Sequence, residues 1–386
     1  MKSLRDPLFG LAVAGSLLGC GGVPAAKDVP ADPISSEQAT FRVVPVVEGL
    51  EHPWAVAFLP DDRLLITERP GRLRLVEDGV LDPAPVAGVP DVYARGQGGL
   101  LDVVPHPDFE TNGLIYLSYA AELDGGAHTR VVRARLEDGA LVDLEEVFQA
   151  RPPAGGSRHF GSRLAFDPEG FLFITIGERG ERELAQELSS HHGTVVRLED
   201  DGTIPNDNPF VGDDGARPEI FSYGHRNAQG LAIHPATGEP WLHEHGARGG
   251  DEINIARAGV NYGWPVITYG IDYSGAPIGE GTAKPGLAQP LYYWVPSIAP
   301  SGMAFYTGDA FPEWQGDLFV GALAGALLAR LELDDGEVIA EERLLETRLG
   351  RIRDVRTGPD GFLYLLTDED PGALYRLEPA GPSASG

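Results

Sequence analysis

The chain has 386 residues, of which 42% are hydrophobic, and this length suits two average domains or one large all-β domain. Lys and Arg number 30 against 58 Asp and Glu, so the net charge of −28 would repel a nucleic-acid backbone and argues against nucleic-acid binding. The 51 Gly and 32 Pro, spread between short apolar runs, indicate many turns and therefore many short strands.

The N-terminus has the pattern of an export signal. Lys2 and Arg5 precede an apolar run at 8–18 that is too short to span a bilayer. The sequence Leu-Leu-Gly-Cys at 17–20 resembles a bacterial lipobox, so residues 1–20 are predicted to be a signal peptide with lipobox, and lipidated Cys20 to anchor a periplasmic or cell-envelope lipoprotein. The alternative is a plain signal peptide in which Cys20 is incidental. Cys20 is the only cysteine, which excludes an internal disulfide.

Residues 21–40, rich in Ala, Pro and Asp, are predicted to be a flexible tether. After them, six segments share one plan, in which a short apolar strand, a turn with Pro, Asp or Gly and a second apolar strand follow one another. They lie at 54–67, 100–119, 163–177, 229–244, 303–321 and 354–367. Within 171–176 the apolar residues occupy both sides of the second strand, as in strands buried on both faces.

A third strand ending in an acidic turn follows most of these pairs, at 73–79, 131–139, 194–202 and 327–336. Such strand-rich repeats without helices predict an all-β, six-bladed β-propeller over residues 41–380, followed by a disordered tail at 381–386. The run FRVVPVV at 41–47 is expected to supply the outer strand of the last blade and close the ring. The alternatives are a β-sandwich or two smaller all-β domains.

In a propeller the residues that precede each innermost strand gather at one mouth of the central channel. The residues at these positions that can bind a ligand are Gln97, His159, Arg163, Arg226, Asn227, Arg351 and Arg353. Several cations beside one imidazole and two amides describe a pocket for a small polyanionic molecule rich in carbonyl groups.

His159 is the only one of these side chains that can act as a base near neutral pH, because arginine stays protonated. An ordinary histidine pKa of about 6.5 suits removal of a hydroxyl proton. The competing interpretation is a structural histidine held by hydrogen bonds. Glycines at 155, 156 and 161 favour an exposed, tight backbone around it.

Six segments together resemble the soluble PQQ-dependent aldose sugar (glucose) dehydrogenase family. They are GQGGLLDVVPHPDF, HFGSRLAFDPEG, GHRNAQGLAIHP, EHGARGGDEIN, NYGWP and RIRDV, in the family's order, within residues 41–379. The resemblance implies a six-bladed propeller that oxidises the anomeric hydroxyl of aldoses to lactones. It also implies two cofactors at one channel mouth, PQQ and calcium, with electrons passing to a quinone or soluble carrier.

The resemblance also implies roles for single residues. His159 resembles the base that takes the C1 hydroxyl proton while hydride passes to PQQ, and Arg226 resembles a catalytic residue that stabilises charge on the reduced cofactor, a role shared with Arg353. The residues that resemble contacts to the carboxylates and quinone oxygens of PQQ are Gln97, Arg226, Asn227, Arg351 and Arg353. Trp294 is similar to an aromatic residue beside cofactor and substrate.

The chain departs from the better-studied glucose dehydrogenase pattern at three positions. Ala324 stands near the position of an expected lysine, so that one contact to a PQQ carboxylate is missing. Arg158 stands where an acidic or amide residue often precedes the base, and Ala247 replaces a proline. These differences match the aldose dehydrogenase branch of the family better.

Calcium binds hard oxygen ligands, backbone carbonyls included, in irregular geometry, and the Gly-rich turn at 246–250 can present such carbonyls. The resemblance implies that the carbonyls of Gly246 and Ala247 bind a calcium that bridges PQQ. It further implies that Glu252 and the carbonyl of Tyr262 belong to a second, structural calcium site. The alternative metal is zinc at His243 and His245, which alternate by two on a strand but have no evident third ligand.

Two functions of other classes compete with the dehydrogenase. A calcium-dependent lactonase-type hydrolase would need carboxylates and Asn converging on one metal, and the arginine-rich mouth argues against it. A non-catalytic binding propeller fits the missing lysine near Ala324, but it would not need a base such as His159.

Overall fold

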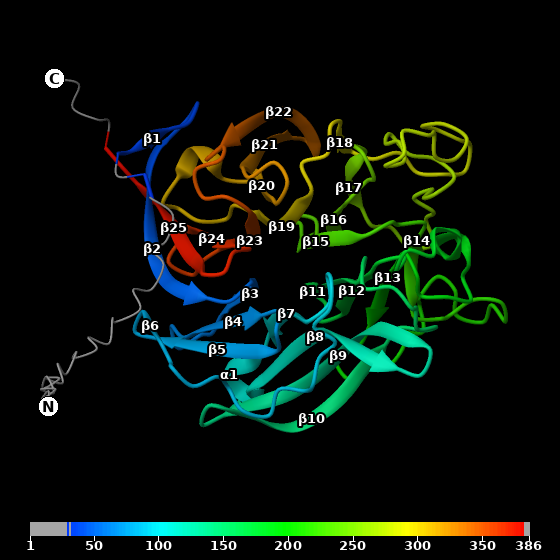
Figure 1. The fold of residues 1–386 in the computed structure, drawn as a ribbon, viewed down its shortest axis with the longest axis horizontal. Coiled ribbons are helices and arrows are strands. Elements are labelled where there is room, and N and C mark those ends of the chain that lie inside the picture. The colour runs from blue at the N-terminus through cyan, green and yellow to red at the C-terminus, as the bar shows by residue number, and fades with distance from the viewer. Residues whose placement is uncertain (1–28, 31, 382–386) are drawn as a thin grey trace, which may run out of the picture.

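The computed structural model describes residues 29–30 and 32–381. The predicted signal peptide, Cys20 and most of the predicted C-terminal tail lie outside them. The described residues form six antiparallel sheets that follow one another around a central axis, and the colour gradient in Figure 1 runs once around this ring. The six-bladed β-propeller predicted from the repeats is confirmed.

Blades 1 to 5 begin at the centre and run outward in chain order, whereas the outer strands of blade 6 come from the N-terminal part of the chain. Blades 1 and 2 consist of β3 (Pro53–Phe58), β4 (Leu64–Glu68), β5 (Arg72–Glu77) and β6 (Val80–Leu81), then β7 (Leu100–Pro105), β8 (Leu114–Leu123), β9 (Gly126–Glu137) and β10 (Ala140–Gln149). Blades 3 and 4 consist of β11 (Gly161–Phe166), β12 (Leu172–Ile176), β13 (Thr194–Leu198) and β14 (Ile220–Tyr223), then β15 (Ala228–Ile233), β16 (Pro240–Glu244), β17 (Asp251–Ile255) and β18 (Tyr292–Trp294).

Blade 5 consists of β19 (Pro300–Phe305), β20 (Leu318–Ala322), β21 (Leu328–Asp334) and β22 (Glu337–Leu344). Blade 6 consists of β23 (Ile352–Thr357), β24 (Leu363–Thr367) and β25 (Gly372–Pro379), with β2 (Thr40–Leu50) and β1 (Ile34–Ser35) outside them. Helical structure among the described residues is limited to α1 (Phe109–Asn112) and the 3₁₀ turns η1 (Arg182–Gln186) and η2 (Pro312–Trp314). None of these helices is long and apolar enough to cross a membrane.

The ring is closed by an N-terminal strand, as the sequence predicts. β2 pairs antiparallel with β25 from Phe41 opposite Pro379 to Leu50 opposite Gly372. The segment expected to be a tether up to residue 40 contains the short strand β1, in which Ile34 pairs with Phe41. The physical reason is apolar burial, because Ile34 packs against the core cluster that includes Phe41.

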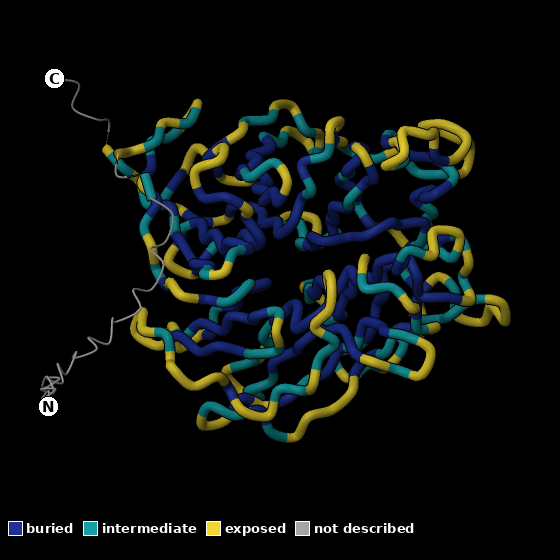
Figure 2. The backbone as a smooth tube through the Cα atoms, in the orientation of Figure 1, coloured by how far each residue is buried: buried dark blue, intermediate teal, exposed yellow. Residues whose placement is uncertain are grey.

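The cores lie between neighbouring blades, and buried backbone surrounds the axis in Figure 2. Hydroxyl groups on the second strands of blades 1, 2 and 3 tie each of these blades to the next, because they donate to carbonyls of the neighbouring innermost strand. Thr67 donates to Leu101 O at 2.5 Å, Ser118 to Ser162 O at 2.6 Å and Thr175 to Ala228 O at 3.1 Å. These bonds fix the innermost strands against one another and therefore position the residues at the mouth.

Arg163 lies in the interior of the propeller and not at the mouth, which corrects the prediction for this residue. Its side chain forms ion pairs with Asp102 at 3.4 Å and Asp354 at 3.0 Å, on the innermost strands of blades 2 and 6. Its guanidinium also lies 4.0 Å from the ring centroid of Trp54 on blade 1. Arg356 pairs with the same two aspartates, at 3.1 and 3.0 Å. Two arginines and two aspartates thus balance their charges where strands of four blades meet.

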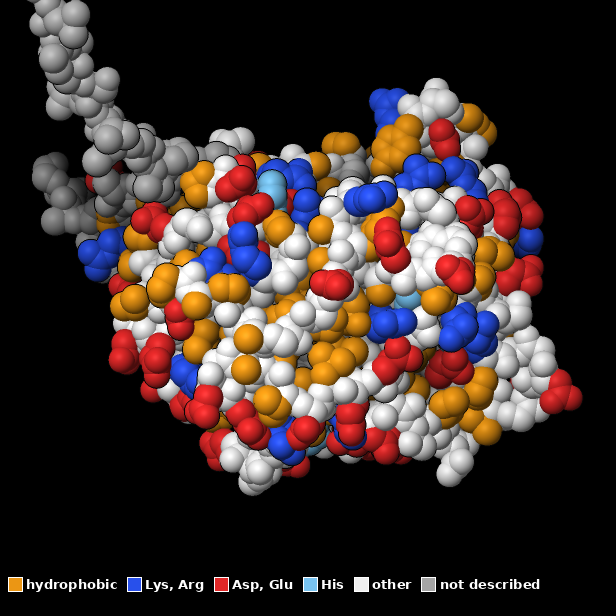
Figure 3. Space-filling view, turned by 60° about the horizontal axis from the view of Figure 1, so that its bottom comes forward, with side chains coloured by type: hydrophobic (Ala, Val, Ile, Leu, Met, Phe, Trp, Pro, Cys, Tyr) orange, Lys and Arg blue, Asp and Glu red, His pale blue; other side chains and the backbone are white. Residues whose placement is uncertain are grey.

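The acidic excess of the chain is distributed over the surface. On the face shown in Figure 3, Asp and Glu side chains lie along the sides and lower edge, interspersed with Lys and Arg, while apolar side chains gather near the middle. Several basic side chains are bound in exposed or half-exposed ion pairs, such as Arg63 with Asp61 and Arg135 with Glu137. Such pairs contribute little to stability.

Candidate active site

Hydrogen bonds join four of the blades at one mouth of the channel. The backbone N–H of His159 donates to Gln97 Oε1 at 2.6 Å, and that of Gly161 donates to Asn227 Oδ1 at 3.2 Å. Gln229 then links Asn227 to blade 6, because Arg353 Nη1 donates to Gln229 Oε1 at 3.4 Å. The structure therefore brings together Gln97, His159, Asn227 and Arg353, as expected from their places before or at the start of innermost strands.

His159 is held in an unusual backbone conformation. Its φ is +55°, in the left-handed region that non-glycine residues seldom occupy. A Cβ at Gly177 would lie 2.1 Å from the His159 carbonyl oxygen, so that only glycine fits there. This close approach of the two backbones fixes where the imidazole lies.

The imidazole of His159 is oriented by a carboxylate that the sequence analysis did not single out. His159 Nδ1 lies 2.8 Å from Glu178 Oε1, and both side chains are buried. An ionised carboxylate only accepts, so Nδ1 carries the proton and Nε2 keeps its lone pair. Burial lowers the pKa of His159, although the hydrogen bond to Glu178 opposes this shift. The ring is therefore neutral near pH 7 and able to accept a proton at Nε2.

Glu178 remains ionised in its buried position. Burial alone would raise its pKa, but the hydrogen bond with His159 and the N–H of Gly180 outweigh it, and the pKa of Glu178 is lowered. A prediction of the antiparallel pairing of β12 with β11 could have identified Glu178 as a partner of His159. Because Gly161 lies opposite Ile176, a residue just after β12 returns beside a residue just before β11.

Arg226 lies between the His159–Glu178 pair and the Gly-rich turn. Its carbonyl accepts from Glu178 N at 2.9 Å, and its Nη1 donates to the carbonyls of His245 at 3.0 Å and Gly246 at 2.5 Å. The guanidinium lies 5.2 Å from the ring centroid of Trp264. Its Nε is buried and has no acceptor among the described residues. Arg226 is thus buried with an N–H group left for a ligand.

Blade 6 adds a second surplus of positive charge. Arg353 Nη2 and Arg351 Nη2 lie 2.8 and 3.2 Å from the same oxygen of Asp368. Burial by itself raises the pKa of Asp368, but Arg353, together with Arg69 and Arg351, holds it far below the usual range. Two arginines therefore share one carboxylate. In the part of the chain that is described, Arg353 Nε has no acceptor either.

Trp294, which the resemblance implied to lie beside cofactor and substrate, is a core residue of the described structure. Its side chain is only 2% exposed and packs in the apolar cluster between blades 4 and 5 with Trp241 and Met303. The reason is strand alternation, which turns Trp294 inward and its neighbour Tyr293 outward. Tyr293 is 44% exposed and stacks on Tyr269, with ring centroids 3.9 Å apart. This stacked tyrosine pair is one of the aromatic features that the segment at 269–294 exposes, beside Tyr273.

Three of the four predicted calcium ligands line one small cavity. Gly246, Glu252 and Tyr262 face it together with Glu244, while Ala247 follows Gly246 in the turn. Glu244 and Glu252 are directly opposite in the β16–β17 pairing, and burial together with the charge of Glu244 raises the pKa of Glu252 well above normal. A buried and a half-buried carboxylate side by side are a donor set that a calcium ion would stabilise.

The zinc alternative lacks a third ligand in the described part of the chain. No group of three or more His, Cys, Asp or Glu able to hold a metal is found there. His245 Nε2 is bonded to Pro300 O at 2.5 Å, whereas His243 is wholly buried against Gly230. The two histidines are therefore structural.

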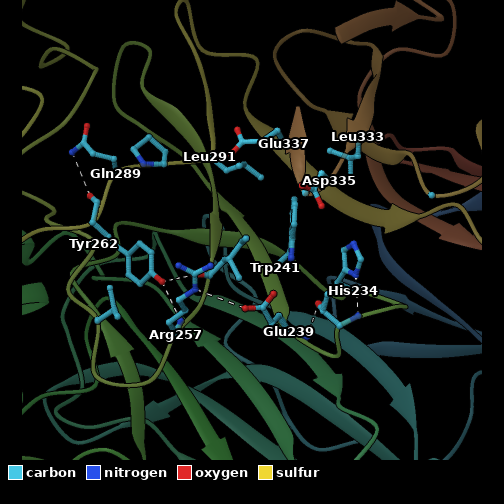
Figure 4. A pocket seen from close by; sticks show the side chains of 17 residues that line it. His234, Glu239, Trp241, Arg257, Tyr262, Gln289, Leu291, Leu333, Asp335 and Glu337 are labelled. Carbon is cyan, nitrogen blue, oxygen red and sulfur yellow. Dashed lines mark hydrogen bonds and ion pairs between the residues drawn. The ribbon is translucent and has the colours of Figure 1, made fainter. Parts of the chain in front are cut away.

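A groove of about 860 Å³ between blades 4 and 5 is separate from this site. It is lined by apolar side chains such as Trp241 and Leu291 and by charged ones such as Glu239 and Arg257, which Figure 4 shows on its wall. Among the described residues that line this groove, Tyr262 is the one that the sequence analysis assigned to the site. The groove is not lined by His159 or by the mouth arginines Arg226, Arg351 and Arg353. We therefore assign the chemistry to the mouth.

Comparison with known proteins agrees with the fold. A model of the glucose/sorbosone dehydrogenase family matches residues 50–376. Aldose sugar dehydrogenase YliI of Escherichia coli (strain K12) is 50% identical over 347 residues, which cover 88% of this chain and 94% of that protein.

Two solved structures extend the comparison. The apo-form of soluble aldose sugar dehydrogenase from Escherichia coli has a TM-score of 0.86 and 49% identity, covering 88% of this chain and all (100%) of that one. The PQQ-bound form of aldose sugar dehydrogenase from Streptomyces coelicolor has a TM-score of 0.74 and 28% identity, covering 89% and 99%.

The six-bladed propeller of this chain is thus the fold of known aldose sugar dehydrogenases. The chain belongs to the glucose/sorbosone dehydrogenase family, and it is an oxidoreductase.

Proposed function

We propose that the protein oxidises the C1 hydroxyl of an aldose to the lactone, with PQQ and calcium as cofactors and His159 as the general base. The observation that carries this proposal is the His159–Glu178 pair, set 2.8 Å apart in a mouth where Arg226 and Arg353 keep unpaired N–H groups. A buried base beside surplus positive charge suits proton removal from a neutral substrate next to an anionic cofactor.

His159 would take the hydroxyl proton at Nε2. Glu178 holds the opposite side of the ring through Nδ1 and stabilises the imidazolium that then forms, which is the orienting role of the carboxylate in a catalytic triad. Since the pKa of His159 is lowered by burial, the base is unprotonated at neutral pH. The Gln97 amide fixes the backbone of the same residue.

The residues of the mouth fit PQQ, which is a tricarboxylate with a quinone. Arg226 and Arg353 have buried Nε–H groups with no acceptor in the described chain, and Arg351 shares its carboxylate partner with Arg353. Gln97, Asn227, Arg226, Arg351 and Arg353 would hold PQQ, and Ala324 provides no lysine contact. When bound, PQQ supplies the quinone that accepts hydride from the sugar. The position of Trp294 in the core argues against a contact with it.

Calcium would complete the site at the Gly-rich turn. The carbonyls of Gly246 and Ala247 would hold the ion that bridges PQQ, beside the carbonyl contact that Gly246 makes with Arg226. The neighbouring carboxylates of Glu244 and Glu252 with the carbonyl of Tyr262 would hold the structural ion. This second assignment is supported by the raised pKa of Glu252, because a bound cation would remove the repulsion between the carboxylates.

The sequence supports export of the protein and anchoring through lipidated Cys20, on a tether that ends at β1. Electrons would then pass from reduced PQQ to a membrane quinone or a soluble carrier. Labelling with a radioactive fatty acid tests the anchor, since Cys20→Ser should abolish incorporation.

The function is tested by adding PQQ and calcium to purified apoprotein and following dye reduction with a panel of aldoses. The proposal expects PQQ absorbance to be retained after gel filtration, and turnover with at least one sugar. It would be overturned by a protein that retains no PQQ and reduces no dye. Lactone hydrolysis by the apoprotein with calcium alone would favour the lactonase instead.

A further inference from the structure

A small, partly open cavity lies behind the loop that carries His159. It offers about 10 Å³, the room for one water molecule or one small ion. Its wall includes three histidines and two arginines, together with Ala150, Pro152, Ile176 and Thr129. Three nitrogens of wall residues, His128 Nδ1, His192 Nε2 and Arg179 Nε, are buried and have no hydrogen-bond partner among the described residues.

The proton of His128 is placed by its neighbours. Arg151 Nη2 donates to Gln149 Oε1 at 2.7 Å, which fixes the orientation of the Gln149 amide. Gln149 Nε2 then donates to His128 Nε2 at 2.9 Å. His128 Nδ1 therefore carries the proton and is a donor without an acceptor.

The proton of His192 follows from a similar arrangement. Ser190 Oγ accepts the backbone N–H of His192 at 3.1 Å and lies 2.7 Å from His192 Nδ1. When the Ser190 hydroxyl donates its proton to Nδ1, His192 Nε2 carries the ring proton. The third histidine, His191, needs no further partner, since it accepts from Arg151 N at 2.8 Å and bonds Glu219 at 2.5 Å.

Arg179 brings a buried positive charge that no carboxylate balances directly. Its side chain forms no ion pair among those found in the described chain, and its Nη atoms donate to the carbonyls of Gly156, at 2.5 Å, and Arg158. The nearest carboxylate, Glu178, is bonded to His159 and Gly180 instead. Burial lowers the pKa of Arg179 to about 10, which still leaves it charged at neutral pH.

We propose that this cavity is a binding site for one halide ion, held by the N–H groups of His128, His192 and Arg179. Three donors, one of them on a cation, suit an ion that only accepts hydrogen bonds. A water molecule fits less well, because it also needs acceptors for its own two protons. The histidines are not a metal site, since their free nitrogens are donors and no metal-binding group is found among the described residues.

The occupant would stabilise the loop of the base. Arg179 is adjacent to Glu178, and its Nη groups hold the carbonyls at 156 and 158 that flank His159. An ion that fixes Arg179 Nε therefore fixes the loop from its inner side. The site does not depend on the proposed sugar oxidation, and it can be tested without cofactor.

The direct test uses bromide, whose anomalous scattering identifies it in a crystal. Crystals of the whole protein soaked in sodium bromide are expected to show an anomalous peak in the cavity, within hydrogen-bond distance of the three nitrogens. A water molecule there and no anomalous peak would overturn the proposal.

A solution test uses thermal unfolding in sodium gluconate, replaced stepwise by sodium bromide at constant ionic strength. The wild-type midpoint is expected to rise saturably by about 2–4 °C. The variant His128→Leu, which removes one donor and fills the space, should lose this rise, while the control variant His234→Leu, in the groove of blades 4 and 5, should keep it. A wild-type midpoint that stays constant as bromide replaces gluconate, or a rise that survives in His128→Leu, would contradict the site.

Discussion

Buried arginines on or just before the innermost strands serve two purposes in this propeller. The hydrogen-bond and ion-pair partners of their side chains distinguish the two groups. Arg163, in the interior, has its Nε bonded to Gln229 O at 2.8 Å and its Nη atoms paired with Asp102 and Asp354. Arg226 and Arg353, at the mouth, are equally buried but keep Nε without an acceptor among the described residues. Both groups are therefore buried, but only Arg163 has a partner for each of its three side-chain nitrogens. Of these three arginines, the two with an unpaired Nε are the ones that lie at the mouth.

The largest expected effect is the loss of stability when the interior pair is broken. Arg163→Met should lower the free energy of unfolding by about 3–5 kcal/mol, because Asp102 and Asp354 lose a buried counter-charge. Urea unfolding followed by tryptophan fluorescence measures it. The matched control Arg63→Met removes a surface pair and should cost less than about 1 kcal/mol. Equal costs for the two variants would show that the interior network does not stabilise the ring.

Arg353→Met should mainly weaken cofactor binding. We expect a loss of PQQ affinity of about 10–100-fold, the value of one charge-assisted hydrogen bond, as measured by absorbance titration. Stability should fall less than in Arg163→Met, because Arg351 still pairs with Asp368. If PQQ affinity were unchanged, Arg353 would belong with the structural arginines.

Glu178→Gln should change the pH dependence of the reaction. The carboxylate raises the pKa of His159 against the effect of burial, so its removal lets that pKa fall further. The acid limb of kcat/KM is expected to move to lower pH, and the rate to fall by about 10²-fold because the amide no longer fixes the Nδ1 proton. A limb that stays in place or moves to higher pH would exclude Glu178 as the partner of the base.

A smaller effect concerns acid stability. Burial lowers the pKa values of His128, His192 and His245 to about 4, below the ordinary value of 6.5 in the unfolded chain. Between these values the unfolded state binds more protons than the folded state, so stability is complete above pH 6.5 and is lost as the pH falls toward 4. Thermal unfolding across this range should show the decline, and His128→Leu should make it shallower. A flat profile would mean that these histidines titrate normally.

The repeat pattern predicted the propeller and its closure because both depend on local strand and turn signals. It also placed the residues before each innermost strand, since propeller topology brings those positions together. It did not distinguish Arg163 from Arg353, because pairing with Asp102 and Asp354 joins residues far apart in the chain. It did not predict the burial of Trp294, whose direction is set by the β17–β18 register. It also passed over Glu178, which becomes a partner of His159 only through the β11–β12 pairing.

The most direct test of the proposed activity separates cofactor binding from chemistry at His159. PQQ and calcium are titrated into the wild type and into His159→Gln, and the reduction of bound PQQ by an aldose is followed by absorbance. We predict that both proteins bind PQQ with similar affinity and that only the wild type reduces it, with a rate loss of at least about 10²-fold in the variant. A His159→Gln protein that reduces PQQ at the wild-type rate would contradict the assignment of the base.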